Sequence, residues 1–153
     1  MVPGKSRNKG YTLIELMVAI VIISILLGLC INGTNNLLQW HRLSKAAVLL
    51  SSELKFTQSM AFYSGEYYKI EFWPTLDRYR IYRQTDLIKD MQLNNLDLYH
   101  TNFPDNHLYF YPSGLPNQGG TVTLKNLKGK VLYVIMTPVT ARVRISSQPP
   151  ENW

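Results

Sequence analysis

A 21-residue apolar segment near the N-terminus limits the folds open to this chain more than any other feature. Residues 11–31 read YTLIELMVAIVIISILLGLCI and contain one charged side chain, Glu15. A helix needs about 20 consecutive apolar residues to cross a bilayer, so this segment is just long enough. Three basic residues precede it, and the next Lys or Arg is Arg42. This asymmetry predicts a single-pass helix with its N-terminus in the cytoplasm and the rest of the chain across the cytoplasmic membrane.

The residues after the apolar segment, together with Glu15, argue against an ordinary secretory signal peptide. Such a peptide ends in a small-residue cleavage site, whereas the chain continues as NGTNNLLQW after Ile31. A charged side chain inside lipid costs about 2.5–3.5 kcal/mol, so a carboxylate within this segment is expected to have a function. We therefore expect the apolar segment to remain attached as an anchor.

A partner for Glu15 becomes available if the chain is cut after Gly10. The cut frees an α-amino group on Tyr11, which lies one helical turn before Glu15. The carboxylate would also lie near the unpaired N–H groups of the first turn, where negative charge is favoured. Two amines are candidates for the positive partner of Glu15: the Tyr11 amine of the same chain and that of a neighbouring chain. In the second arrangement the buried ion pair sets the register between subunits.

The segment KGYTLIELMVAIVIISILLGL, residues 9–29, resembles the N-terminus of type IV pilins and pseudopilins. The family pattern is a short basic leader, Gly, a cleavage point, usually Phe, and then T-L-I-E-L at the start of a long apolar helix. The resemblance implies that residues 1–10 are a leader peptide and that a prepilin peptidase cuts between Gly10 and Tyr11. It also implies N-methylation of Tyr11 and a role for Glu15 as the assembly glutamate. Tyr11 departs from the usual Phe but keeps an aromatic ring.

The sequence pattern predicts that this helix continues to Ser64. Five apolar residues recur at helical spacing along one stripe: Leu43, Ala47, Leu50, Leu54 and Ala61. Gly65 is a typical helix stop. Residues 32–36, NGTNN, form helix poorly, and they mark either the membrane boundary or a point where the helix bends or melts in a filament. We expect residues 32–64 to form an amphipathic continuation that carries a globular domain.

Beyond Gly65 the hydrophobic period changes from helical to alternating, which predicts a β-rich domain over residues 65–153. Residues 67–73 and 78–83 form a predicted hairpin, and residues 84–107 are less regular. Further strands are expected at residues 88–93, 108–111, 120–124, 130–136 and 142–145. Turn signals at this spacing indicate one antiparallel sheet or two small sheets. The predicted fold class is therefore α+β, with a long N-terminal helix packed on an antiparallel β domain.

The region from residue 110 to residue 145 shows a second resemblance, to minor pseudopilins of GspH/FimT type. The family pattern is F-x-P-x-G, then G-G-T-[IV]-x-L, a turn glycine, a Val-rich strand and T-G-R-[IV]-R. Ala141 departs from it, because the family has Gly at this position. The matching residues are Phe110, Gly114, Gly119, Gly120, Thr121, Arg142 and Arg144.

Together the two resemblances imply a pilin-like fold and a subunit of a type II secretion pseudopilus or a type IV pilus. The implied partners are other pilins or pseudopilins, the prepilin peptidase, the inner-membrane assembly platform and membrane lipid. The implied location is the cytoplasmic membrane, followed by a periplasmic or extracellular filament.

Basic and aromatic residues keep nucleic-acid binding open as an alternative function. The chain has 16 Lys and Arg against 10 Asp and Glu, a formal charge of +6, and removing residues 1–10 leaves 13 − 10 = +3. Basic residues interleaved with aromatic ones are able to bind single strands. Residues 78–83 show this pattern, because tyrosines lie next to each of three arginines: Arg78, Arg80 and Arg83. A second basic cluster, in a predicted turn, consists of Lys125, Lys128 and Lys130. Because a solvated sheet face explains these charges more simply, a DNA-binding minor pilin of a competence system is kept only as the alternative.

The sequence contains no residue pattern typical of an enzyme or a metal site. P-loop, G-x-G-x-x-G and C-x-x-C motifs are missing from it, and its acidic residues form no D-x-D-x-D calcium run. The single cysteine, Cys30, excludes an intrachain disulfide. We therefore expect no catalytic residue, no metal and no cofactor. An enzyme anchored by one helix is the third functional class, and this lack of motifs counts against it.

Overall fold

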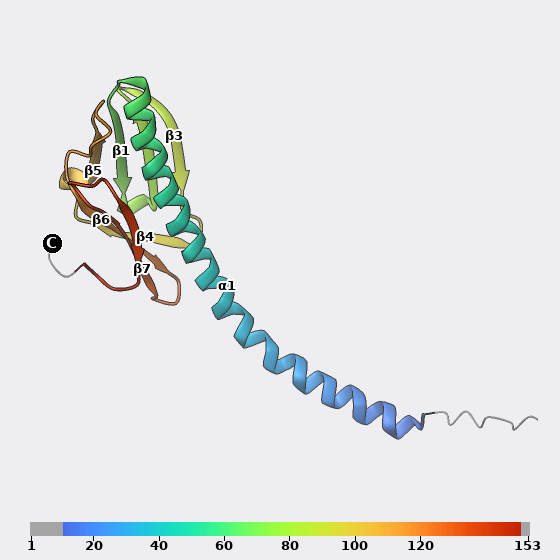
Figure 1. Ribbon diagram of the computed structural model, residues 1–153. Coiled ribbons are helices and arrows are strands. Elements are labelled where there is room, and N and C mark those ends of the chain that lie inside the picture. The colour runs from blue at the N-terminus through green and yellow to red at the C-terminus, as the bar shows by residue number, and fades with distance from the viewer. Residues whose placement is uncertain (1–10, 151–153) are drawn as a thin grey trace, which may run out of the picture. The chain divides into compact units, whose positions relative to one another are not determined.

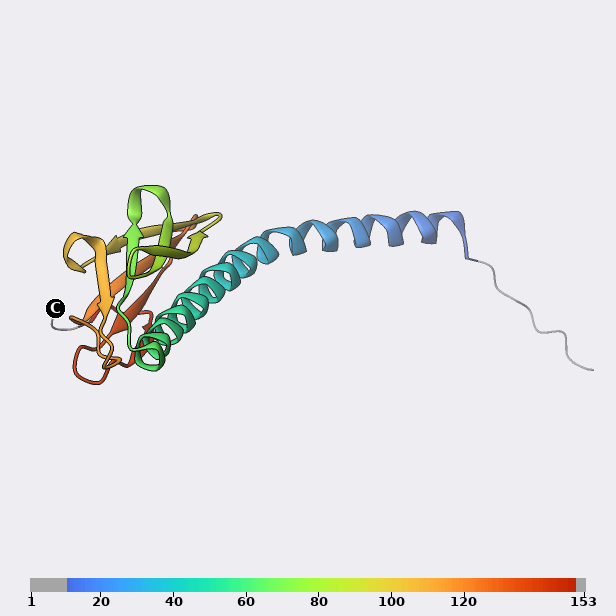
Figure 2. The ribbon, with the colours of Figure 1, turned by 90° about the horizontal axis from the view of Figure 1, so that it is seen from above.

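The computed structural model describes residues 11–150 of the chain, without the side chains of residues 29–34. The predicted leader, residues 1–10, therefore lies outside the described residues. The chain divides into two compact units, of which the first ends at Leu37 and the second begins at Leu38. Figures 1 and 2 show one long helix, α1, followed by the strands of a β domain.

Helix α1 extends over Leu13–Ser64 and contributes to both units. Within the second unit, the five residues of the predicted apolar stripe are each at most 1% exposed, which confirms the expected burial. The helix ends at Ser64, and the N–H of the next residue, Gly65, donates to the carbonyl of Ala61 at 3.1 Å. Gly65 has a φ of 69°, a left-handed conformation that costs glycine little and that stops the helix.

Among the described residues, eight strands form two four-stranded antiparallel sheets, which confirms the predicted α+β class. The first sheet has the strand order β3-β2-β1-β5. Its strands are β1 (Tyr68–Trp73), β2 (Arg78–Arg83), β3 (Asp86–Gln92) and β5 (His107–Phe110). β1 and β2 form the predicted hairpin. The short 3-10 helix η1, Pro74–Leu76, connects these two strands.

The second sheet has the strand order β4-β6-β7-β8. Its strands are β4 (Leu96–Thr101), β6 (Gly120–Asn126), β7 (Val131–Met136) and β8 (Val143–Ser146). A 3-10 helix, η2 (Pro104–Asn106), lies between β4 and β5 in the chain. The sequence pattern missed β4. Its pairing with β6 shifts register between Leu98 and His100, and such a bulge interrupts the alternation by which strands are recognised.

One apolar core in the second unit joins α1 to both sheets. The stripe of α1 is buried in the same cluster as Ile70 of the first sheet and Leu124 of the second. The ring of Phe72 stacks on that of Phe103, with centroids 5.6 Å apart and planes 11° apart. This second unit therefore begins within α1, because the helix residues from Leu43 onward bury their apolar side chains against the strands.

Candidate functional site

The first turn of α1 contains reciprocal hydrogen bonds between Thr12 and Glu15. The backbone N–H of Glu15 donates to Thr12 Oγ1, and the backbone N–H of Thr12 donates to Glu15 Oε2, both at 3.3 Å. The Thr12 hydroxyl also lies 3.3 Å from Glu15 Oε2 and donates to it. The arrangement is a capping box, in which side chains accept from N–H groups that the helix itself leaves unpaired.

The capping box holds the Glu15 carboxylate at the helix N-terminus, where the helix dipole favours negative charge. The carboxylate is exposed, and Tyr11 immediately precedes the box. Gly10, the other half of the predicted cleavage site, lies outside the described residues. The sequence analysis did not identify Thr12, although the spacing T-x-x-E before an apolar run is the known signal for a capping box. The candidate site therefore consists of Tyr11, Thr12 and Glu15.

The helix that follows this site presents apolar side chains on every face. Each large apolar side chain from Leu13 to Leu27 is more than half exposed, with values from 52% to 78%. A helix that is apolar all round requires an apolar environment, either lipid or other helices. Within the described residues, no helix contains an apolar stretch long enough to cross a membrane.

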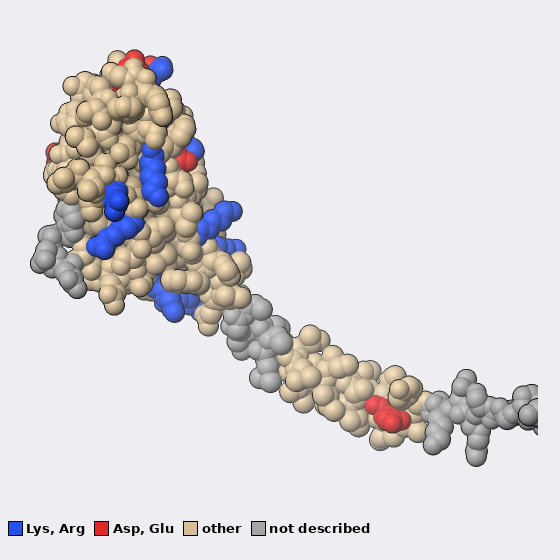
Figure 3. All heavy atoms as spheres, viewed as in Figure 1, with Lys and Arg blue, Asp and Glu red and all other residues tan. Residues whose placement is uncertain are grey.

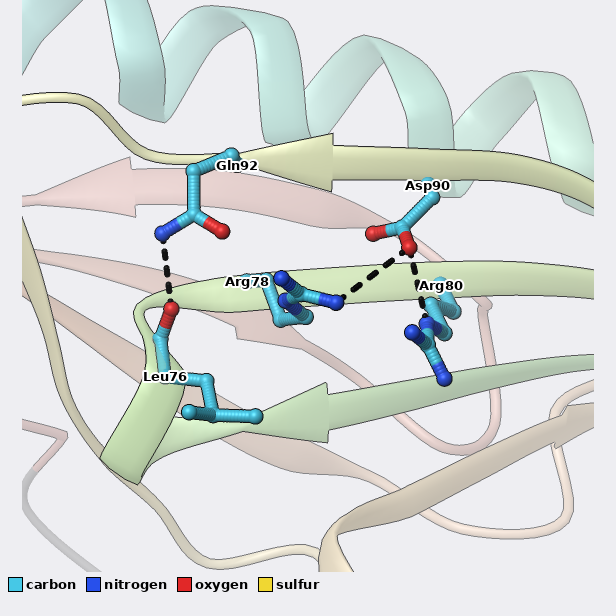
Figure 4. Close-up of polar contacts among 5 residues, drawn as sticks. All are labelled: Leu76, Arg78, Arg80, Asp90 and Gln92. Carbon is cyan, nitrogen blue, oxygen red and sulfur yellow. Dashed lines mark hydrogen bonds and ion pairs between the residues drawn. The ribbon is translucent and has the colours of Figure 1, made fainter.

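The arginines considered for nucleic-acid binding form ion pairs with acidic residues. Arg80 Nε lies 2.9 Å and Arg78 Nη1 lies 3.4 Å from the same oxygen, Asp90 Oδ2. Figure 4 shows both guanidinium groups on β2 directed toward this carboxylate on β3. Beside them, the side chain of Gln92 donates to the carbonyl of Leu76 at 2.7 Å.

The third arginine of this group is also ion-paired. Arg83 lies 3.6 Å from a Glu66 carboxylate oxygen and 3.9 Å from one of Asp86. The three arginines are thus matched by three acidic side chains, and the cluster has a formal charge near zero. Phosphate binding depends on unneutralised positive charge, so this geometry does not favour the cluster as a nucleic-acid interface.

A further charged group lies on β1 and β5, around Glu71. Lys69 Nζ lies 2.5 Å and His107 Nε2 lies 3.3 Å from Glu71 Oε1. Burial raises the pKa of Glu71, but the hydrogen bond and charge of Lys69, with His107, outweigh burial and lower this pKa overall. The hydrogen bond to Glu71 in turn raises the pKa of Lys69. In the described part of the chain, no group of three His, Cys, Asp or Glu side chains is placed to hold a metal ion.

Comparison with known proteins finds similarity in the N-terminal segment and in the fold. Residues 5–31 match a family model described as the prokaryotic N-terminal methylation motif. The fold resembles that of the minor pseudopilin EpsH from the type 2 secretion system of Vibrio cholerae. The TM-score is 0.59 at 14% sequence identity, covering 69% of this chain and 96% of EpsH. The chain therefore carries the N-terminal methylation motif and has a fold similar to that of a minor pseudopilin.

A second solved structure with the same fold is the type IV minor pilin FimU of Pseudomonas aeruginosa (strain PAO1). Its TM-score against this pilin-like protein is 0.59 at 14% identity, covering 72% of this chain and 94% of FimU. Comparison with curated protein sequences gives no match.

Two positions of the C-terminal pattern in this pilin-like protein have left-handed backbone conformations, one occupied by glycine and one by alanine. Gly114 has a φ of 76°, a backbone conformation that residues other than glycine adopt with strain. Ala141 has a φ of 50° at the place where the GspH/FimT pattern has Gly. The backbone there keeps the left-handed turn that glycine would favour, at a cost that glycine would avoid.

Proposed function

We propose that this pilin-like protein is a minor pilin or pseudopilin subunit of a type II secretion pseudopilus or a type IV pilus. A prepilin peptidase removes residues 1–10, Tyr11 is N-methylated, and the subunit enters a filament from the cytoplasmic membrane. Its partners are other pilins or pseudopilins, the peptidase, the inner-membrane assembly platform and lipid. Its role is structural, not enzymatic.

The capped Glu15 at the start of an exposed apolar helix is the observation that carries this proposal. Charge at the edge of an apolar segment is costly unless it is paired. In a filament, the methylated amine of a neighbouring Tyr11 supplies that pair, and the apolar residues that follow pack against other helices. Before assembly, the same helix lies in the cytoplasmic membrane with its N-terminus inside.

Intact-mass analysis of the membrane-extracted protein tests the processing step. The protein is made in cells with and without the prepilin peptidase, and a Gly10→Leu variant serves as an uncleavable control. We expect loss of residues 1–10 and gain of one methyl group only in wild type with the peptidase. An uncut chain in both strains would contradict the proposal. A cut near residue 35 would instead indicate a secreted protein with a removable signal.

Incorporation into filaments tests the assembly role of Glu15. Glu15→Gln keeps the size of the side chain and removes its charge, so we expect the variant to be cut normally but to be depleted from sheared filaments by about tenfold or more. Glu66→Gln makes the same chemical change in the second unit and is the matched control. Equal incorporation of all three proteins would show that the charge of Glu15 is not used in assembly.

A further inference from the structure

Four exposed basic side chains lie on α1 near the start of the second unit or on the turn after β6, and we call them the basic collar: Arg42, Lys45, Lys128 and Lys130. The lysines at 128 and 130 come from the turn between β6 and β7, and Lys130 Nζ lies 5.8 Å from the centre of the Trp40 ring. Successive helix residues are rotated by about 100°. Arg42 and Lys45 therefore lie about 200° and 140° around the helix from Trp40. The collar therefore places positive charge on two roughly opposite sides of α1 within about two helical turns.

The turn that carries two of the collar lysines is held in one conformation by Asn126. This residue is 2% exposed. Its Oδ1 accepts from the backbone N–H groups of Lys128 at 3.0 Å and Lys130 at 2.9 Å. The backbone N–H of Asn126 donates to the Lys130 carbonyl at 2.9 Å. The position of Lys130 beside Trp40 is therefore set by a closed hydrogen-bonded turn, which also carries Lys128.

The basic collar lacks the acidic partners that neutralise Arg78 and Arg80. None of its four members forms an ion pair with any residue that the structure describes. No acidic residue occurs in the sequence between Glu15 and Glu53. On the neighbouring strand β4, Asp97 stands opposite Lys125, which is not part of the collar. Figure 3 shows Lys and Arg side chains over the viewed face of the domain, with few acidic side chains among them.

The length of chain between the apolar segment and the collar limits their separation. Trp40 follows Ile31, the last residue of the predicted span, by nine residues. Nine residues cover about 14 Å as a helix and at most about 32 Å when fully extended. A membrane crossed by residues 11–31 is therefore always within reach of the collar, whatever conformation the intervening residues take.

We propose that the basic collar binds anionic phospholipid headgroups at the surface of the membrane in which the subunit is anchored. This inference rests on the proposed function, because it requires residues 11–31 to span the membrane. Clusters of Lys and Arg next to a membrane-spanning helix are attracted to anionic lipid. Trp40 adds an amphipathic ring of the kind enriched at membrane–water interfaces. The collar thereby holds the second unit against the membrane until assembly extracts the helix.

A fluorescence-quenching experiment on the full chain tests the collar. Leu127, which is 63% exposed at the tip of the same turn, is changed to Cys in a Cys30→Ala background and labelled with a fluorophore. The chain is reconstituted into vesicles of phosphatidylcholine, or of three parts phosphatidylcholine to one part phosphatidylglycerol. Both contain a lipid with a nitroxide on its headgroup. We expect at least twofold greater quenching in the anionic vesicles, with the difference lost at high salt.

Charge-reversal variants identify the residues responsible. Lys128→Glu/Lys130→Glu and, independently, Arg42→Glu/Lys45→Glu are expected to reduce quenching to the level seen in phosphatidylcholine. Arg142→Glu/Arg144→Glu makes the same change in net charge beside Lys55, farther along the helix, and should retain the wild-type response. Circular dichroism of each variant establishes that it is folded.

The outcomes separate this inference from the proposed function. If alkaline carbonate extracts the chain from the vesicles, the predicted span is wrong, and the collar proposal falls with it. If the chain stays inserted but quenching does not depend on lipid charge, the collar proposal alone is wrong. If an added single-stranded oligonucleotide changes the fluorescence of the label on this turn, and anionic lipid does not, the collar binds nucleic acid instead.

Discussion

The ring of Phe103 occupies the space that a side chain at position Gly120 would need. A Cβ atom built on Gly120 would lie 2.4 Å from Phe103 Cε1, far inside van der Waals contact. Phe103 itself is buried and stacked on Phe72. Glycine at the start of β6 is therefore required by a close approach between this strand and the residues after β4, which explains the second glycine of the G-G-T pattern.

Replacing Gly120 by Ala should destabilise the second unit by about 1–3 kcal/mol, because Phe103 must move out of its packed position. Urea unfolding in detergent, followed by near-UV circular dichroism, measures this change. Phe103→Leu should be destabilising alone, and the double variant should be more stable than the sum of the single effects predicts. Strict additivity would show that the two positions do not clash.

The ion pair of Glu71 with Lys69 predicts a pH dependence of stability with a definite sign. Its pKa is lowered in the folded state, so its contribution is present above the unfolded pKa of about 4.3. That contribution is lost as the pH falls through the folded pKa. Glu71→Gln should therefore cost about 1–3 kcal/mol at neutral pH, and the difference from wild type should shrink in acid. Unfolding curves at several pH values measure it, and Asp105→Asn, at an exposed acid, is the control.

The capping box predicts that Thr12 stabilises the first turn of α1. Thr12→Ala removes the acceptor for the Glu15 N–H and should cost about 1 kcal/mol of local helix stability. Amide hydrogen exchange by mass spectrometry should be about fivefold faster over the first turn. Ser24→Ala, which removes a hydroxyl that donates to the Ile20 carbonyl in the same helix, should leave the first turn unchanged. Faster exchange in both variants would point to general loosening of the helix.

The ion pairs of Arg78, Arg80 and Arg83 predict that these residues have little part in binding nucleic acid. Alanine substitution of the three arginines together with their partners Glu66, Asp86 and Asp90 keeps the net charge of the chain. It should leave the affinity for a single-stranded oligonucleotide within about threefold of wild type, because the removed charges already offset one another. Fluorescence anisotropy at low salt measures this. A loss of tenfold or more would restore the DNA-binding alternative. Asp90→Asn is a useful companion, since it frees two of the three guanidinium groups.

Local patterns in the sequence determined the helix and much of the β domain. The apolar stripe from Leu43 to Ala61 and the stop at Gly65 follow from helical spacing and from the backbone freedom of glycine. The hairpin of β1 and β2 follows from alternation interrupted by a proline-containing turn. These features depend on residues close together in the chain, and the N-terminal methylation motif is a contiguous motif of the same kind.

The tertiary structure alone decided which distant groups meet. Strand β4 was missed because its bulge breaks the alternation that marks a strand. The pairing of Arg80 with Asp90 depends on the register of β2 against β3, and the basic collar depends on the turn after β6 lying beside Trp40. The number of charged residues in a sequence does not predict which of them pair. Ion pairs form through space, between segments that only the folded chain brings together.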